Sequence, residues 1–212
     1  MEYDAGRDER VTIEDMVLDD LEAVAELAHQ AWFHSDYQGL QDKVSLFFVT
    51  QHLRRATLAR VARLGGRIVG VMFANVQGEQ VVYGDEGRAQ MERLEAELEE
   101  SEVGRYFLSI FRGYVRDHAE LEAEARQRCD AECQMYIVLP AMQGTGIGRL
   151  LWNDMIRYFR DCGAKRYFLY TDTDCNWQIY ERKGLEKAAE DRRIKHDGSD
   201  YAQFIYVGDV GE

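Results

Sequence analysis

The amino-acid sequence predicts an α/β fold, in which strands and amphipathic helices alternate along one domain over residues 1–212. Two observations carry this prediction. Runs rich in β-branched and aromatic residues recur along the chain, and stretches with apolar side chains at helical spacing separate them. A hydrophobic content of 46% gives a core of the size that one such domain needs. Pro140 is the one proline, so no Pro-rich linker divides the chain.

The N-terminal third is expected to hold a strand, two helices and a β-hairpin. The strand alternates polar and apolar side chains, and each helix carries an apolar stripe. Gly65-Gly66 lies between two β-like runs, which is typical of a hairpin turn. The predicted elements are a strand at 10–16, a helix from Asp19 to about Trp32, a helix at about 38–56, and strands at 58–64 and 67–76.

Residues 77–130 differ from the rest of the chain and predict a helical insertion in the α/β core. Two helical stretches fill this segment, which holds 14 acidic residues against 7 basic ones. The insertion could cover a cleft, form the subunit contact of a homodimer, or simply present a solvated charged face. These alternatives stay open at the level of sequence.

The C-terminal third returns to alternating strands and helices. Gly163 and Gly184 are expected to end helices, and Asp197-Gly198 suits a hairpin turn. The predicted elements are a strand at 132–139, a helix at 146–162, a strand at 166–171, a short helix at 176–182, and strands at 185–195 and 201–207.

Composition excludes several classes of function. The net charge of −13 repels phosphate backbones and argues against nucleic-acid binding. An acidic surface suits a cationic substrate such as an amine, although solubility alone accounts for it equally well. The sequence shows neither a signal peptide nor a membrane span, and its four cysteines have no framework spacing, so we expect a cytoplasmic protein with reduced thiols. The histidine spacing predicts no metal site.

The most informative segment runs from Tyr136 to Leu151. An apolar strand ends near Val138, a loop with glycines at 144, 146 and 148 follows, and an amphipathic helix then begins. Helix N-termini present free N–H groups and the positive end of the helix dipole, and glycines let a ligand approach the backbone closely. A phosphate or pyrophosphate is the natural ligand. The alternative is a tight turn without a ligand; neither the Walker nor the dinucleotide-binding glycine pattern fits.

This segment resembles the acetyl-CoA signature of the GNAT acetyltransferase superfamily, Q/R-x-x-G-x-G/A, from Gln143 to Gly148. The fuller pattern of that family is matched from Val138 onwards, and Tyr180-Glu-Arg-Lys-Gly-Leu185 is similar to its Y-E-x-x-G-F segment. The resemblance implies a mixed, mostly antiparallel central sheet that splays at the acetyl-CoA strand and is flanked by helices. It also implies transfer of acetyl from acetyl-CoA, as cosubstrate, to a primary amine. The insertion lies outside the common core.

The resemblance also implies which residues bind acetyl-CoA. The loop amides hold the pyrophosphate, and the preceding strand pairs with the pantetheine arm. An asparagine often bonds pantetheine seven residues before the family's tyrosine, but Thr173 stands there and Asn176 lies nearby, so both are candidates. The implied cofactor-binding residues are Ile137, Val138, Gln143, Gly144, Thr145, Gly146, Ile147, Gly148, Thr173 and Asn176.

Two residues are candidates for proton transfer. Tyr180 matches the tyrosine that many relatives place beside the CoA sulfur, and its phenol can support the departing thiolate. Glu132 lies at the offset where the histone-acetylating branch carries a glutamate base. The alternatives are a core tyrosine, a solvated strand-end glutamate, and water as the base. A covalent role for Cys175 is disfavoured, because no histidine is close to it in sequence.

The acceptor is expected near the junction of the first two helices. Trp32, His34 and Tyr37 combine aromatic and polar side chains that could surround an amine, although a place in the core is the favoured alternative for Trp32. The acceptor is an amine-bearing small molecule or peptide whose identity the sequence does not give. Two alternative functions stay open: an acyltransferase that uses a longer acyl-CoA, and an acyl-CoA-sensing protein without turnover.

Overall fold

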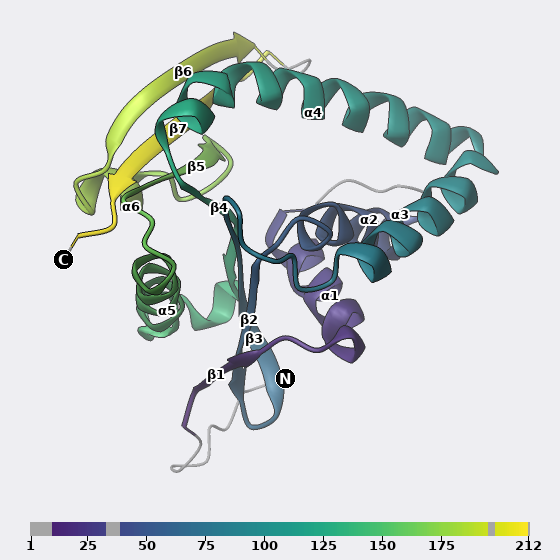
Figure 1. Ribbon diagram of the computed structural model, residues 1–212. Helices are drawn as coiled ribbons and strands as arrows, with labels where there is room; N and C mark the ends of the chain where they lie inside the picture. The colour runs from purple at the N-terminus through teal and green to yellow at the C-terminus, as the bar shows by residue number, and fades with distance from the viewer. Residues whose placement is uncertain (1–9, 33–38, 195–197, 212) are drawn as a thin grey trace.

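The computed structural model describes residues 10–32, 39–194 and 198–211, and its centre is one seven-stranded sheet (Figure 1). The spatial order of the strands is β1-β2-β3-β4-β5-β7-β6. The strands are β1 (Thr12–Asp15), β2 (Leu58–Leu64), β3 (Arg67–Val76), β4 (Ala131–Val138), β5 (Arg166–Asp172), β6 (Glu186–Ile194) and β7 (Asp200–Asp209).

The sheet is mixed and mostly antiparallel, as predicted. Every neighbouring pair of strands is antiparallel except β4 and β5, which run parallel. The β4–β5 pairing covers residues 131–133 of β4 against 167–169 of β5, and it ends there. Beyond this point the two strands separate, so the sheet is divided into a β1–β4 half and a β5–β7 half. This separation is the splay that the sequence comparison led us to expect.

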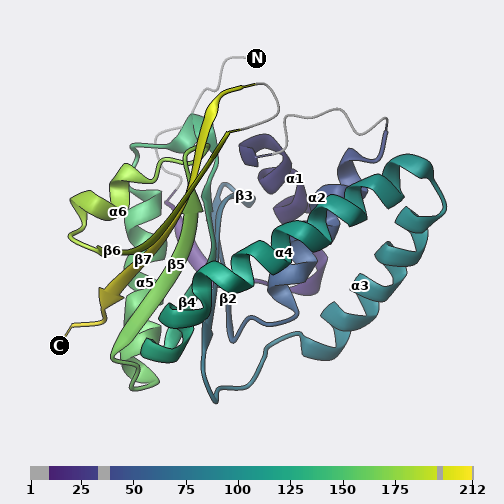
Figure 2. The same cartoon turned by 90° about the horizontal axis from the view of Figure 1, so that it is seen from above.

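Helices cover both faces of the sheet. The helices α1 (Leu21–Trp32) and α2 (Gln41–Leu53) lie on one face, and α5 (Ile147–Asp161) and α6 (Gln178–Arg182) lie on the other (Figure 2). Short 3₁₀ turns at Leu18–Asp20 and Pro140–Met142 precede α1 and α5. Each face therefore has its own apolar core, since residues of alternating strand positions pack against different helices.

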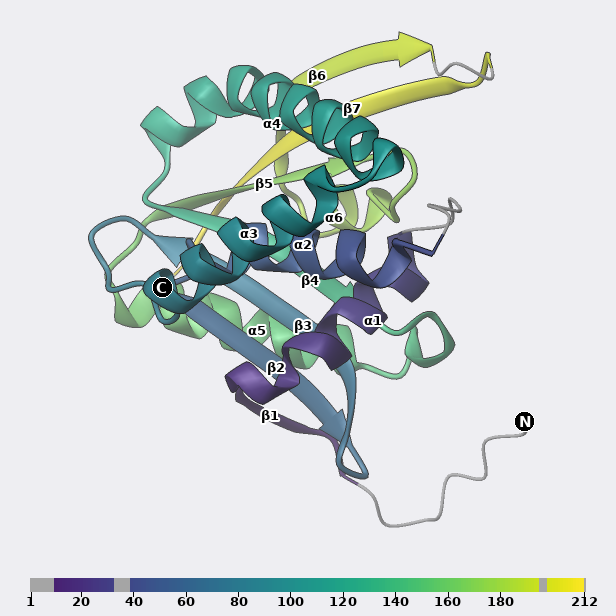
Figure 3. The same ribbon diagram turned by 90° about the vertical axis from the view of Figure 1, so that its right-hand side faces the viewer.

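Two helices, α3 (Gly84–Glu99) and α4 (Glu102–Arg128), lie in the predicted insertion between β3 and β4. A sharp corner joins them, and Ser101 caps α4 by accepting a hydrogen bond from the Gly104 amide at 2.9 Å. A Cβ at Gly104 would lie 2.0 Å from the carbonyl oxygen of Leu98, so only glycine fits this corner. From there α4 runs back over the sheet (Figures 1 and 3).

Candidate active site

The predicted phosphate loop lies at the N-terminus of α5, directly after β4. The loop reverses the chain through glycines in the left-handed region, with φ of 82° at Gly144 and 92° at Gly146. These conformations cost other residues energy, which explains the residue choice. A Cβ at either glycine would meet nothing within 4 Å, so these two glycines serve the backbone conformation and an open surface rather than internal packing.

The backbone amides of this loop point to an anion. Within the described parts of the chain, the amides of residues 146–149 donate no hydrogen bond to a protein acceptor. The loop residues Gln143, Gly144 and Thr145 are exposed. Free amides at the positive end of a helix dipole are the features that bind phosphate groups. The loop therefore fits a pyrophosphate.

Gly148 brings α5 close to β4. A Cβ at Gly148 would lie 2.4 Å from the hydroxyl oxygen of Tyr136, so the first turn of the helix rests directly on this side chain. Burial raises the pKa of Tyr136 to about 12, and its phenol stays protonated at neutral pH. Gly148 therefore sets the distance between the loop and β4, which are the two elements expected to hold CoA.

The second half of β4 has one paired and one unpaired edge. Ile137 and Val138 pair with β3, opposite Val71 and Gly70. On the other side, the pairing with β5 has already ended at Cys133. The exposed edge of β4 can therefore pair with the amides of a pantetheine arm, as an added strand would.

Tyr180 lies on α6 at the base of the separation between β4 and β5. It is 8% exposed, and its ring lies between those of Trp152 and Tyr206, with centroids 5.9 Å and 5.7 Å away. Burial raises the pKa of its phenol well above 10, and Cys133, at the last β4–β5 pair, adds to the shift. The phenol is protonated at neutral pH and can donate a hydrogen bond to a sulfur atom at this point.

The two alternatives for a pantetheine contact differ in their surroundings. The Thr173 hydroxyl accepts a hydrogen bond from the Ala202 amide at 3.2 Å, and the Thr173 amide donates one to the Ala202 carbonyl at 3.0 Å. Thr173 thus continues the β5–β7 pairing. Both residues are exposed, Asn176 at the turn before α6. Because the Thr173 hydroxyl already accepts a backbone hydrogen bond, the Asn176 amide has more hydrogen-bonding capacity left for a ligand.

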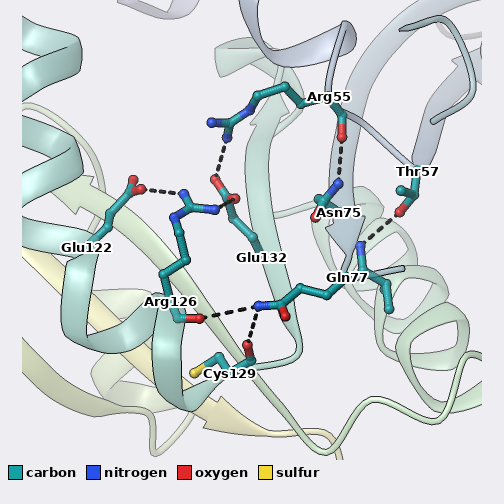
Figure 4. Close-up of polar contacts among 9 residues, drawn as sticks. Arg55, Thr57, Asn75, Gln77, Glu122, Arg126, Cys129 and Glu132 are labelled. Atoms are coloured by element: carbon teal, nitrogen blue, oxygen red, sulfur yellow. Dashed lines mark hydrogen bonds and ion pairs between the residues drawn. The ribbon is translucent and has the colours of Figure 1, made fainter. Parts of the chain in front are cut away.

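Glu132, the predicted base, is held by two arginines (Figure 4). It is 7% exposed; its Oε1 accepts from Arg55 at 3.0 Å and its Oε2 accepts from Arg126 at 3.0 Å. Arg126 also donates to Glu122 on α4. A substrate amine would have to compete with two guanidinium groups for this carboxylate. The geometry therefore favours a structural role, in which Glu132 joins α4 to β4.

The predicted acceptor residues are only partly described. Trp32 is half-buried and packs edge-to-face against Phe48, with ring centroids 5.6 Å apart. It also adjoins the core between α1 and the sheet. His34 and Tyr37 lie outside the described residues. The contacts of Trp32 agree with the core alternative.

Comparison with known proteins gives the family. The sequence matches the description "Acetyltransferase (GNAT) family" over residues 21–185, which is most of the chain. The chain belongs to this family. It is accordingly an acyltransferase of the GNAT type, as the sequence predicted. No curated protein sequence matches it.

Solved structures agree with this GNAT fold. The ribosomal-protein-S18-alanine N-acetyltransferase from Escherichia coli is 17% identical, with a TM-score of 0.56 and 96% of each chain covered. A polyamine N-acetyltransferase from Drosophila melanogaster is 13% identical, with a TM-score of 0.56, covering 94% of this chain and 100% of that one. An N-acetyltransferase from Staphylococcus aureus Mu50 is 12% identical, with a TM-score of 0.54, covering 95% and 99%. At these identities the similarity shows the fold alone.

The described residues of this GNAT protein include neither a membrane-spanning helix nor a cluster of metal-ligating side chains. No helix among them is long and apolar enough to cross a membrane. Those same residues contain no group of three or more histidine, cysteine, aspartate or glutamate side chains arranged to hold a metal ion.

Sequence reasoning missed a group of rings on the face opposite the phosphate loop. His118 on α4 stacks between Tyr114, one helical turn earlier, and Tyr170 of β5, with ring centroids 3.7 Å and 3.5 Å away. His118 also lies close enough to His52 of α2 to lower the pKa of His52. The spacing of Tyr114 and His118 shows only that they share a helix face. Nothing in the sequence indicates that this face meets β5.

Proposed function

We propose that this acyltransferase moves an acetyl group from acetyl-CoA to a primary amine, by direct attack of the amine in a ternary complex. The free amides of residues 146–149 carry this proposal, because they form a pyrophosphate site at one end of an unpaired strand edge. The loop follows the end of β4, and Tyr180 lies close enough to Cys133, where the β4–β5 pairing ends, for that thiol to raise its pKa. This order along β4 suits a ligand that is anionic at one end and carries a thioester at the other.

Direct attack needs few protein groups. The uncharged amine nitrogen forms a bond to the thioester carbonyl carbon, the carbon–sulfur bond breaks, and the thiolate leaves with the electron pair. The proton that the nitrogen then loses passes to a base, a water molecule or Glu132, and from the solvent to the CoA thiolate. Tyr180 supports the thiolate by donating a hydrogen bond. Because burial raises the pKa of Tyr180 above that of an ordinary thiol, its role is to stabilise the charge rather than to transfer its proton completely.

A covalent route through Cys175 has less support. Burial raises the pKa of this thiol to about 12, so it is protonated at neutral pH. The thiolate is the reactive form of cysteine, and a thiol in this state is a poor nucleophile. The acetyl group therefore goes from sulfur to nitrogen in one transfer.

The identity of the base is tested by Glu132→Gln. If Glu132 serves the fold, this variant loses about 1–3 kcal/mol of stability, because two guanidinium groups lose a buried anionic partner, while the pH profile of kcat/KM stays that of the wild type. A profile that loses its acidic limb would instead assign the base to Glu132. Thermal unfolding and steady-state kinetics on the same preparation separate these outcomes.

The location and assembly of the protein also belong to the proposal. The four cysteines are free, which agrees with a reducing compartment such as the cytoplasm. From the sequence we also propose that the protein can form a homodimer. Cell fractionation and size-exclusion chromatography with light scattering test the two.

The first experiment measures thermal unfolding with and without acetyl-CoA, followed by thiol release in the presence of an amine panel. We expect a higher melting temperature with acetyl-CoA and thiol release with at least one amine. Butanoyl-CoA, measured in parallel, tests the alternative of a longer acyl group. A higher melting temperature without thiol release from any amine would favour an acyl-CoA sensor, and an unchanged melting temperature would refute the loop as the CoA site.

A further inference from the structure

The insertion helix α4 connects the two halves of the sheet across their separation. Near its start, Phe107 and Phe111 pack edge-to-face on Phe47 of α2, with centroids 5.8 Å and 5.1 Å away. Near its end, Ala125 packs in a cluster with Phe168 of β5 and residues of β7. Because α2 covers the β1–β4 half and β5 belongs to the other, α4 spans the gap between them (Figure 1).

The middle of this span lies where β4 and β5 part. Tyr170 is the first residue of β5 beyond the last β4–β5 pair, Cys133 with Leu169. The His118 ring of α4 stacks on Tyr170 at 3.5 Å between centroids. His118 is therefore positioned over the beginning of the separation. Its helix, α4, lies on the same side of the sheet as α1 and α2, opposite α5 (Figure 2).

Two half-buried side chains near this point have buried polar atoms without a partner. The Nε2 of His118, and both the nitrogen and the oxygen of the Gln134 amide, are buried without a hydrogen-bond partner in the described structure. Gln134 is the first residue of β4 beyond the last pair with β5, at the irregularity where β4 slips against β3. An unsatisfied buried polar group costs about 1–3 kcal/mol. Gln134 on β4 and Tyr170 on β5 each follow the last β4–β5 pair, and His118 stacks on Tyr170, so both unsatisfied groups adjoin the beginning of the separation. A polar ligand at this point would satisfy them.

We propose that α4 closes the acceptor side of the active site, limits the acceptor to a small primary monoamine, and orients its nitrogen through His118. This inference rests on the proposed acetyl transfer and adds the class of acceptor. Every acceptor would then have to enter beneath α4 to reach the thioester, which a small amine can do more easily than a protein surface or an extended peptide.

The charges near His118 favour a monoamine over a polyamine. Asp117, beside it on α4, pairs with Arg193 of β6. Asp172, on the same strand as Tyr170, accepts hydrogen bonds from the Tyr201 hydroxyl at 3.0 Å and from the amide of residue 174 at 2.9 Å. Glu132 is held by its two arginines. Since these carboxylates are engaged, a second ammonium group would find no carboxylate ready for it among them.

The rings around His118 and its charge state indicate the rest of the acceptor. Tyr114 and Tyr170 flank the imidazole with aromatic faces. Burial lowers the pKa of His118 to about 3, so the ring is neutral at neutral pH. A neutral ring can form a hydrogen bond with an uncharged amine, and the surrounding aromatic rings make this point apolar, which suits an apolar or aromatic carrier of the amine. The acceptor class is thus a small arylalkylamine or alkylamine.

The acceptor class is tested by thiol release from acetyl-CoA with three amines: 2-phenylethylamine, spermidine, and a short peptide with a free N-terminus and one lysine. We expect kcat/KM to be highest for 2-phenylethylamine and lowest for the peptide. A kcat/KM for the peptide or for spermidine equal to or above that for 2-phenylethylamine would overturn the inference.

The role of His118 is tested by His118→Phe, which keeps a ring in the stack and removes both ring nitrogens. We expect the KM for 2-phenylethylamine to rise about fivefold or more, with the acetyl-CoA-induced rise in melting temperature unchanged. Glu120→Ala, an exposed position on the same helix, is the matched control and should keep the wild-type KM. A wild-type KM in His118→Phe would overturn the assignment.

The closing role of α4 is tested by Tyr114→Ala, which removes a ring from the middle of the span. We expect kcat/KM for the peptide to rise relative to that for 2-phenylethylamine. An unchanged ratio in a folded variant would count against closure, and His118→Phe carries the test if circular dichroism shows Tyr114→Ala unfolded. Wild-type protein that releases no thiol with any amine would contradict the proposed function itself, and this inference would fall with it.

Discussion

The two sides of the gap between β4 and β5 are built in different ways. On the side of α5, one contiguous loop of six residues, Gln143 to Gly148, provides the candidate phosphate site. On the side of α4, the candidate acceptor site takes residues from several elements: Gln134 of β4, Tyr170 of β5, and Tyr114 and His118 of α4.

The chemical groups that the two sides offer a ligand also differ. The α5 side relies on backbone amides, whose direction follows from glycine conformations and a helix N-terminus. The α4 side relies on side chains, whose neighbours depend on how distant segments pack. A family can therefore keep one donor site while each member changes its acceptor site through an insertion such as α3 and α4.

The largest expected effect comes from breaking the α5 side with Gly146→Glu. The substitution places a β-carbon on a backbone with φ of 92° and a carboxylate at the phosphate position, and we expect acetyl-CoA affinity to fall by about 100-fold or more in calorimetry. Gly163→Glu is the matched control, because Gly163 has φ of 78° at the other end of α5. Normal affinity in Gly146→Glu would show that the site is misplaced.

A smaller effect is expected where the two sides meet, at Tyr180. Tyr180→Phe keeps the buried ring and removes the hydroxyl, so we expect kcat to fall about tenfold with little change in acetyl-CoA affinity. Tyr206→Phe is the neighbouring control. It removes the hydroxyl that donates to Glu181 at 3.1 Å and should leave kcat nearly unchanged. Wild-type kcat in Tyr180→Phe would remove its role as hydrogen-bond donor to the leaving thiolate.

Two variants and their combination test whether α5 contacts β4 through Gly148 and Tyr136. Gly148→Ala forces a β-carbon against the Tyr136 hydroxyl, 2.4 Å away, and should cost about 1–3 kcal/mol of stability through overpacking. Tyr136→Phe removes that oxygen, so the double variant should regain most of the loss. Urea unfolding of the four proteins gives the coupling energy, and a value near zero would show that the two residues do not meet.

The smallest effect per residue concerns two half-buried histidines on the α4 side. Burial lowers the pKa of both His52 and His118 to about 3, from an ordinary value near 6.5. Below pH 6.5 these two histidines bind protons in the unfolded chain but stay neutral in the folded chain. The free energy of unfolding therefore falls as the pH drops from 6.5 towards 3.

At pH 5 this loss amounts to about 1–2 kcal/mol for each histidine. The double variant His52→Phe/His118→Phe should lose less stability than the wild type between pH 7 and pH 5, and urea unfolding at both values measures the difference. At pH 8 both histidines are neutral in either state, so the linkage disappears there. Equal losses in the two proteins would show that these rings are already accessible to protons.

Much of the fold could be predicted because its signals are local. The hairpin strands at 58–64 and 67–76 have the predicted limits, and α5 begins at Ile147, directly after the glycine predicted to open it. Period-two and helical patterns, together with glycines at turns, need no knowledge of distant segments. The two helices of 77–130 were also predicted, but where they pack was not.

The candidate acceptor site could not be predicted in the same way. Glu132 carries the residue type and offset of a base, yet its arginine partners come from positions 55 and 126, and only the packing of α4 against the sheet brings all three together. The contact between His118 and Tyr170 likewise joins residues 52 positions apart.

The sequence by itself determined the element order, the family and the glycine loop at the start of α5, because each depends on backbone conformations and patterns within a few residues. The tertiary structure alone decided that α4 crosses the gap between the two halves of the sheet, that Glu132 is bound by two guanidinium groups, and that His118 lies over the beginning of the gap. The physical reason is that the pKa and hydrogen bonding of a side chain follow from its burial and its neighbours, and those neighbours come from distant parts of the chain.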